Sequence, residues 1–280
     1  MSLDLSAVGY KTETYDFKYD WKTVALYALG IGAKKAELDY VYEARGPKVF
    51  PTFAVAPAYP LVGDMLGKTQ GNLAMVVHGG QLIRMHRPIP SEGTLKTTGT
   101  VVGIYDMKKM AQVVLETKTE VNGEPCFDTV WSILFRGAGG FGGAPPPKAD
   151  VVKRPEGKQP DWTHEEPTAP EQALLYRLSG DLNPLHADPE FAKMVGFSQG
   201  PILHGLCTYG FVGRAVVLQA CGGDGNKLKN FHAQFRKPVW PGESIRTVGY
   251  DLGGGKIAVE AFAADRPEPV ITNAWAEIES

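Results

Sequence analysis

Residues 201–218 read PILHGLCTYGFVGRAVVL, a mostly apolar stretch that begins with a proline and carries three glycines. A helix through 202–218 would be apolar on nearly every side, and such a helix is buried inside a protein. Because its glycines lower helix propensity, we expect them to allow close packing against a sheet. The helix would begin near His204 and Gly205, where backbone N–H groups have no partner within the helix and can stabilise a negative oxygen.

Runs that alternate apolar and polar residues occupy both halves of the chain. Such period-two runs, separated by glycine, aspartate and asparagine turns, are typical of antiparallel strands. The predicted strands are 95–102, 111–119 and 129–135 in the first half, and 244–250, 256–262 and 270–278 in the second. An apolar helix and several strands per half predict the α+β class, with a sheet packed on a helix.

Short phrases recur in the two halves and indicate an internal duplication. The paired phrases are 27–32 with 176–181, the His78-Gly79 step with His204-Gly205, and 87–93 with 237–243. Between the halves, residues 144–170 lack hydrophobic periodicity and contain seven prolines. Proline-rich chain stays extended without donating sheet hydrogen bonds. We therefore predict repeats at 1–143 and 171–280, joined by a linker at 144–170.

The overall composition excludes several classes of protein. A chain of 280 residues with a net charge of −2 and 43% hydrophobic residues is typical of a globular protein large enough to bury a core. Near-neutral charge argues against a nucleic-acid partner. No apolar run is long enough for a membrane span, so no membrane association is expected. The three cysteines form no CxxC pair, which suits a reducing compartment.

The chemistry concentrates in residues 180–186, which read GDLNPLH. Asn183 and Pro184 are typical of a helix start, with asparagine as the cap and proline at the first helical position. Asp181 and His186 therefore lie on one glycine-bearing turn, where a carboxylate and an imidazole can hold a water and move protons. Capping residues beside a structural histidine are the simpler interpretation. No metal site is predicted, because His186 and His204 are 18 residues apart and have no cysteine partner.

The 180–186 motif, followed by the 201–206 segment PILHGL, resembles the signature of the MaoC-like, (R)-specific enoyl-CoA hydratases, called hydratase 2. Residues 77–81, 87–90 and 139–143 are similar to the N-terminal half of the two-repeat hydratase 2 of peroxisomal multifunctional enzymes. The resemblance implies a double hot-dog fold, in which each repeat wraps an antiparallel sheet around a long central helix. It also implies one active site, in the second repeat, because the first repeat lacks the Asp and His at this spacing.

The family's reaction is the reversible hydration of a trans-2-enoyl-CoA to a (3R)-3-hydroxyacyl-CoA. The resemblance implies that Asp181 and His186 hold the water and move its protons, that Asn183 helps to position it, and that the Gly205 N–H stabilises the thioester oxygen. The non-catalytic first repeat would bind the acyl chain and CoA. The implied substrate-binding residues are His78, Gly79, Lys108, Leu182, Pro184, Leu185 and Phe235.

Other expectations concern the setting of this activity. No cofactor is expected, since coenzyme A is part of the acyl-CoA thioester substrate, and the implied assembly is a homodimer. A bacterial cytoplasmic location is expected, with the peroxisome as the alternative, since the chain ends without a peroxisomal address of the Ser-Lys-Leu type. Two other functions stay open: a hot-dog acyl-CoA thioesterase and a non-catalytic acyl-CoA binding module.

Overall fold

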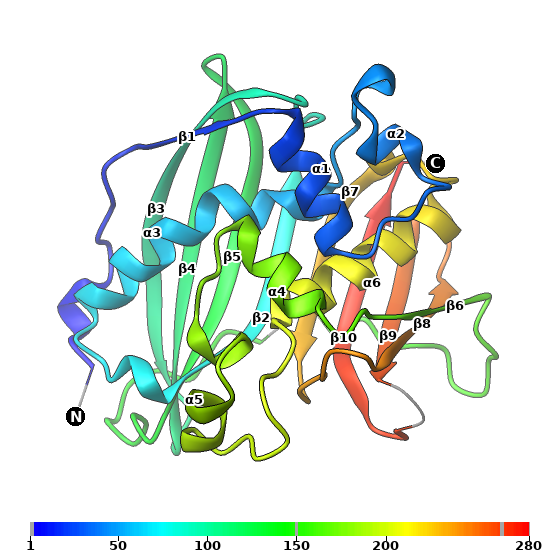
Figure 1. Ribbon diagram of the computed structural model, residues 1–280. Coiled ribbons are helices and arrows are strands. Elements are labelled where there is room, and N and C mark those ends of the chain that lie inside the picture. Colours follow the sequence, from blue (N-terminus) through cyan, green and yellow to red (C-terminus); the bar gives the residue numbers. More distant parts are fainter. Residues whose placement is uncertain (1–2, 149–150, 264–265, 280) are drawn as a thin grey trace.

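The computed structural model describes residues 3–148, 151–263 and 266–279, which form two similar halves around one ten-stranded sheet (Figure 1). The strands of the first half are β1 (Tyr15–Tyr19), β2 (Val76–Met85), β3 (Gly93–Asp106), β4 (Met110–Val121) and β5 (Glu124–Arg136). Those of the second half are β6 (Trp162–Pro167), β7 (Leu228–Phe235), β8 (Ser244–Asp251), β9 (Lys256–Ala263) and β10 (Pro269–Ile278). Every pairing between them is antiparallel.

The order of the strands repeats on either side of the junction between β2 and β7. Outward from that junction the first half runs β2-β5-β4-β3-β1, and the second half runs β7-β10-β9-β8-β6. Each strand thus has a counterpart at the same distance from the junction, which is the arrangement expected for a duplicated hot-dog unit. The predicted α+β class is confirmed, and all six predicted strands lie within strands of the structure.

One part of the predicted linker is a strand. Residues 162–167 form β6, which pairs with β8 along the sheet edge, with Glu165 opposite Arg246. Its position makes β6 the counterpart of β1 in the first half. Charged residues are common on edge strands, because they discourage pairing of the free edge with another chain. The sequence 162–167, WTHEEP, accordingly lacks the apolar alternation used to predict the other strands.

Two long helices lie across the same face of the sheet, one over each half (Figure 1). The helices are α1 (Trp21–Gly30), α2 (Leu38–Val41), α3 (Val55–Lys68), α4 (Gln172–Tyr176), α5 (Pro189–Met194) and α6 (Gly205–Ala220). The predicted buried helix is α6, in which the twelve residues from Leu206 to Val217 are all buried. Its counterpart α3 was not predicted, because Pro57 and Pro60 interrupt the helical signal.

The predicted match between the two His-Gly steps is wrong. His204-Gly205 lies at the start of α6, whereas His78-Gly79 lies within β2. The register of β2 against β5 shifts between His78 and Gly80, so Gly79 occupies a bulge. A Cβ at Gly79 would lie 2.9 Å from Leu134 side-chain carbons. The glycine here allows two strands to pack closely and does not mark a helix start.

The glycines of α6 allow close packing, but chiefly against the first repeat rather than against the sheet. A Cβ at Gly210 would lie 2.2 Å from Cγ2 of Ile31, and one at Gly213 would lie 2.5 Å from Cγ2 of Thr52. Both contacts come from the first half, where Ile31 directly follows α1 and Thr52 lies in the 3-10 helix Pro51–Ala54. The central helix of the second repeat is therefore part of the interface that holds the two repeats together.

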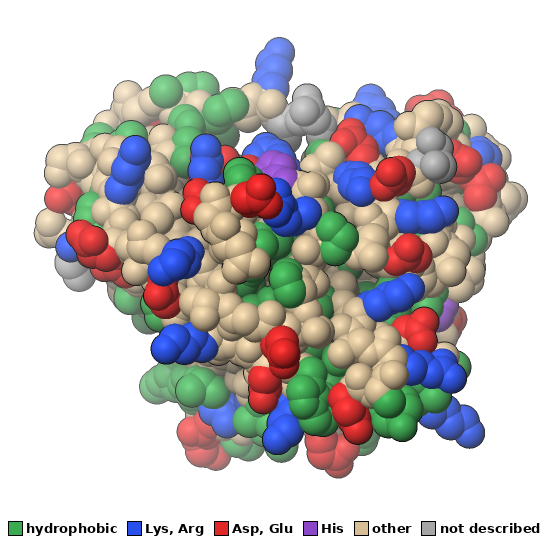
Figure 2. All heavy atoms as spheres, turned by 90° about the horizontal axis from the view of Figure 1, so that it is seen from above, with side chains coloured by type: hydrophobic (Ala, Val, Ile, Leu, Met, Phe, Trp, Pro, Cys, Tyr) green, Lys and Arg blue, Asp and Glu red, His purple; other side chains and the backbone are tan. Residues whose placement is uncertain are grey.

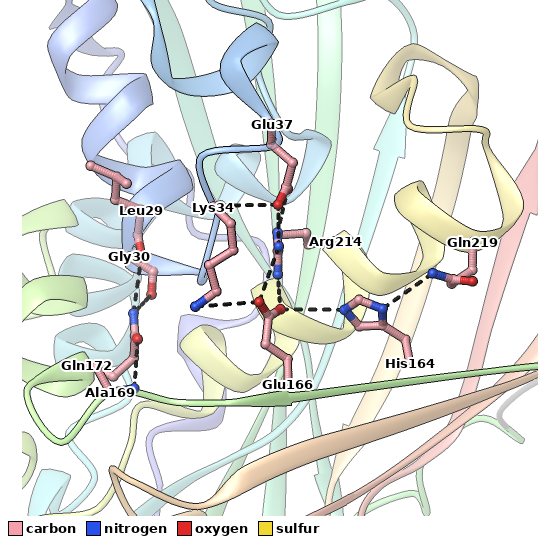
Figure 3. A network of polar contacts seen from close by, with 10 residues as sticks. All are labelled: Leu29, Gly30, Lys34, Glu37, His164, Glu166, Ala169, Gln172, Arg214 and Gln219. Carbon is pink, nitrogen blue, oxygen red and sulfur yellow. Dashed lines mark hydrogen bonds and ion pairs between the residues drawn. The ribbon is translucent and has the colours of Figure 1, made fainter.

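A buried ion cluster joins the same surfaces (Figure 3). Arg214, near the middle of α6, binds Glu166 on β6 and Glu37 in the first repeat, with its Nε 2.6 Å from a Glu37 carboxylate oxygen. Burial alone would raise the pKa of Glu166, but hydrogen bonds from His164 and Arg214 and the Arg214 charge lower it to about 2. The cluster therefore holds its charges in a largely dry interface between the repeats.

The distribution of charge on the surface agrees with the near-neutral net charge of the sequence. On the face shown in Figure 2, the described acidic and basic side chains are intermixed and form no patch of a single sign. None of the helices in the described residues is long and apolar enough to cross a membrane.

Candidate active site

The turn that carries Asp181 is built by local backbone preferences. Gly180 has φ +125°, a conformation that residues with a side chain rarely adopt. Asn183 then caps the short helix Pro184–His186, its side-chain oxygen accepting a hydrogen bond from the Leu185 N–H at 3.0 Å. Asn183 also donates its backbone N–H to Oδ1 of Asp181 at 3.2 Å. In this structure the residue therefore shapes the turn, and a water contact could come only from its remaining amide hydrogens.

His186 lies against the start of α6 with one ring nitrogen fixed. Its Nδ1 is 2.8 Å from the carbonyl oxygen of Ile202, which can only accept, so this nitrogen carries the proton. Nε2 is then the basic nitrogen of the neutral ring. Burial lowers the pKa of His186, although the nearby Asp181 charge opposes that effect. A neutral imidazole with a free Nε2 is the form that can accept a proton from water.

His204 connects the turn that carries Asp181 to the start of α6. Its Nε2 donates to the backbone carbonyl of Asp181 at 3.1 Å, and its ring stacks on that of His186 with centroids 3.8 Å apart. Burial and the neighbouring His186 lower the pKa of His204 to about 2, so the ring is neutral. Together these contacts hold Asp181 and His186 against the N-terminal end of α6.

Ligand atoms of Asp181, His186 and His204 all lie within 4.8 Å of one another. The two imidazoles are stacked with an interplanar angle of 28°, so their lone pairs do not converge on a point between them. A metal ion needs donors that converge on it in a tetrahedral or octahedral set. The geometry therefore favours two stacked neutral rings beside a carboxylate over a metal centre.

The predicted oxyanion donor and two predicted substrate-binding residues lie beside this group. Gly205 is the first residue of α6, so its N–H has no partner within the helix. A Cβ on Gly205 would lie 3.5 Å from the ring of Phe235. The Phe235 ring contacts that of His78 with centroids 4.8 Å apart, and His78 in turn stacks on Trp131. An apolar wall thus runs from the helix start into the first repeat.

The remaining predicted residues lie further out. On the turn formed by residues 180–186, Leu182 and Pro184 are exposed and Leu185 is half-buried. These three residues can form the rim of the site. Lys108 is exposed in the turn between β3 and β4. Gly79 faces Leu134, so the structure supports a packing role for it and not a place in this group.

Two known domain types match the chain in succession. The model of the MFE-2 hydratase 2 N-terminal domain matches residues 17–137, and that of the MaoC like domain matches residues 151–263. A 3-hydroxyacyl-thioester dehydratase Y of Mycobacterium tuberculosis is 39% identical over 255 residues, covering 89% of this chain and 87% of the relative. The chain belongs to the MaoC-like hydratase 2 family. It is an enzyme of a family of hydro-lyases.

Further relatives span the two-repeat unit. An enoyl-CoA hydratase 2 of Dictyostelium discoideum, named as probable, is 36% identical, covering 88% of this chain and 87% of its own length. The crystal structure of a MaoC-like dehydratase from Phytophthora capsici has a TM-score of 0.90 and 32% identity, covering 99% and 98% of the two chains. In the peroxisomal multifunctional enzyme type 2 of Drosophila melanogaster, the similar region is 48% of that chain (TM-score 0.81, 32% identity, 95% of this chain).

Sequence reasoning missed one side chain that contacts Asp181. Tyr59, on α3 of the first repeat, donates its hydroxyl to Oδ1 of Asp181 at 2.7 Å. The two residues are 122 positions apart, and α3 itself was not predicted, so no local pattern could have paired them. The hint available in the sequence was a tyrosine between two prolines in an otherwise apolar segment, 55–62.

The buried neutral histidines make the enzyme sensitive to acid. Burial lowers the pKa of His78 to about 4 and, together with the neighbouring His186 ring, that of His204 to about 2. Unfolded histidines have pKa values of about 6.5, so the unfolded chain binds more protons than the native chain below pH 6.5. These two sites therefore add stability above pH 6.5 that is progressively lost as the pH falls toward 4.

We expect the free energy of unfolding, measured by urea titration, to decrease by about 2–3 kcal/mol per pH unit between pH 6 and pH 4.5. A His86→Gln variant, which replaces an exposed histidine, should show the same decrease. A free energy of unfolding that stays constant across this range would contradict the burial of two neutral rings.

Proposed function

We propose that this enzyme catalyses the reversible hydration of trans-2-enoyl-CoA thioesters to (3R)-3-hydroxyacyl-CoA thioesters. One observation carries the proposal. The Asp181 carboxylate and the His186 ring have ligand atoms within 4.8 Å of each other, and His186 lies against the segment that leads into Gly205 at the start of a buried helix. Addition of water to an unsaturated thioester requires groups that transfer protons and a hydrogen-bond donor for the thioester oxygen. The Asp181–His186 pair and the Gly205 N–H can supply both.

The chemistry follows from these positions. Asp181 and His186 hold one water, whose O–H bond breaks as its oxygen bonds to C3 of the enoyl group and its proton passes to the pair. The electron pair of the C2–C3 double bond moves toward the thioester, and the charge that develops on the carbonyl oxygen is stabilised by the Gly205 N–H. A proton from the catalytic pair then forms the new C–H bond at C2. Loss of one oxyanion donor typically costs about 3–4 kcal/mol of transition-state stabilisation.

Residues from both repeats complete the substrate site in this proposal. His78 and Phe235 form the apolar wall next to Gly205 and would contact the acyl group. Leu182, Pro184 and Leu185 would border the mouth of the site. Lys108 would bind a CoA phosphate as a point charge, which its exposed position in the β3–β4 turn permits. We further propose a homodimer and a bacterial cytoplasmic location; relatives include both a bacterial and a plant peroxisomal enzyme.

An absorbance assay combined with a thiol assay tests the reaction. We expect the absorbance of the conjugated enoyl thioester to fall with no release of free CoA thiol. Release of thiol would indicate an acyl-CoA thioesterase, and binding with no change in either signal would indicate a non-catalytic binding module. Either of those results would contradict the proposed hydration. Rates for enoyl-CoA chains of about 4 to 16 carbons would then define the preferred acyl length.

A further inference from the structure

The hydrogen bonds to the Asp181 side chain all fall on one of its two oxygens. Oδ1 accepts from the Tyr59 hydroxyl at 2.7 Å and from the Asn183 backbone N–H at 3.2 Å. Among the described residues, no hydrogen bond to Oδ2 occurs within the protein. Such an arrangement fixes the rotation of the carboxylate and leaves Oδ2 as the oxygen available to a water or a substrate proton.

Tyr59 is held firmly enough to act in this way. Its ring contacts the buried Trp131 with centroids 6.4 Å apart, and Trp131 also stacks on His78. Burial and the charge of Asp181 raise the pKa of Tyr59, so its hydroxyl keeps its proton and can only be the donor in this pair. A hydrogen bond from a neutral hydroxyl to a carboxylate is charge-assisted and stronger than one between neutral groups.

The pairing also crosses between the two repeats. Tyr59 belongs to α3, the central helix of the repeat that lacks the catalytic aspartate and histidine, whereas Asp181 belongs to the second repeat. Asn183 contributes a backbone donor that any residue except proline could supply at this position. The hydroxyl of Tyr59 is the side-chain donor to this carboxylate, and it comes from outside the catalytic repeat.

We infer that Tyr59 is a positioning residue for the hydration reaction: it orients the Asp181 carboxylate from the first repeat, so that Oδ2 faces the reacting water. The inference rests on the proposed function and extends it. The first repeat then contributes to the rate of the chemical step as well as to the shape of the substrate site.

A Tyr59→Phe variant isolates the hydroxyl, because phenylalanine keeps the ring that packs on Trp131. We expect kcat for a trans-2-enoyl-CoA to fall by about 10- to 100-fold, while KM stays within about twofold. We also expect the low-pH limb of the kcat/KM profile to move to higher pH, since the ionised carboxylate has lost a donor. The other ionisable groups facing this carboxylate, unchanged in the variant, are His186, His204, His78 and Tyr176.

The chain offers a matched control on the same helix. Tyr10 donates its hydroxyl to Asp64 of α3 at 2.9 Å, on the exposed side of the protein. Tyr10→Phe therefore removes the same kind of hydrogen bond from α3 and should keep the wild-type kcat and pH profile. Tyr59→Leu also lacks the hydroxyl and should show the same shift in the low-pH limb of the kcat/KM profile. The result then does not depend on the folding of one variant.

The outcomes separate this inference from the proposed function. If wild type and Tyr10→Phe hydrate the substrate and a folded Tyr59→Phe matches them in kcat and pH profile, the positioning role is overturned and the hydratase assignment stands. If Tyr59→Phe raises KM with kcat unchanged, Tyr59 only binds substrate, which also overturns the role. A wild-type enzyme without hydration activity overturns both.

Discussion

Replacement of Asp181 by asparagine is expected to lower kcat for enoyl-thioester hydration by about 1,000-fold while the fold remains intact. Positioned acid–base groups contribute roughly 100- to 10,000-fold to rates. Asparagine keeps the size of the side chain and can still accept from Tyr59 and from the Asn183 N–H, so the change removes charge and basicity and little else. Steady-state kinetics at pH 7, with circular dichroism as the check on folding, measure the effect.

His186→Gln should produce a loss of similar size, because in the proposed mechanism Nε2 of His186 is the second half of the same proton-transfer pair. Residues that act as one unit are not additive, so the double variant should be little worse than either single one. Asp188→Asn is the matched control: Asp188 caps α5 by accepting from the backbone N–H of Glu190 at 2.9 Å, and asparagine caps equally well. If Asp188→Asn lowered kcat as much as Asp181→Asn does, the result would contradict a specific role of Asp181 in proton transfer.

Arg214→Met should be the most destabilising of the substitutions considered, by about 3–5 kcal/mol in free energy of unfolding. The change leaves Glu37 and Glu166 as buried carboxylates without their main cation, and breaking a buried ion pair from one side typically costs this much. The lowered pKa of Glu166, about 2, means that this carboxylate stays ionised at pH values below the ordinary carboxyl range. Its contribution is therefore complete at pH 7 and is lost as the pH falls from about 4 toward 2.

Urea unfolding at pH 7 measures this loss against two comparison variants. Arg45→Met removes an exposed ion pair with Asp39, which should cost at most about 1 kcal/mol. The second variant combines Arg214→Met with Glu37→Gln and Glu166→Gln. It removes the two unpaired carboxylate charges and should regain much of the lost free energy of unfolding. If Arg214→Met costs no more than Arg45→Met, the cluster does not hold the repeats together.

Local signals account for the parts of the molecule that the sequence predicts well. The six predicted strands, which lie in β3, β4, β5, β8, β9 and β10, follow from period-two alternation, and α6 follows from a long apolar run. The Asp181–His186 turn follows from a glycine, a cap and a proline within seven residues. Each of these signals is contained in one short segment, so a single sequence is sufficient to recognise it.

The missed features depend on pairings that no short segment contains. Tyr59 reaches Asp181 across 122 positions, and Arg214 reaches Glu37 across 177. Arg214 stands in a segment that otherwise indicates an apolar core, and the carboxylates that make its burial tolerable come from a loop and an edge strand. The strand β6 has no apolar alternation of its own and is defined by its partner β8. In each case the deciding interaction is tertiary.

The configuration of the product tests the central claim most directly. In the proposed mechanism the turn with Asp181 and His186 fixes the water and the start of α6 fixes the thioester carbonyl, so only one face of the double bond should receive the water. Wild-type enzyme with a trans-2-enoyl-CoA should give the (3R)-3-hydroxyacyl-CoA, identified by chiral chromatography of the hydrolysed product. A product of S configuration, or a racemic one, would contradict the account.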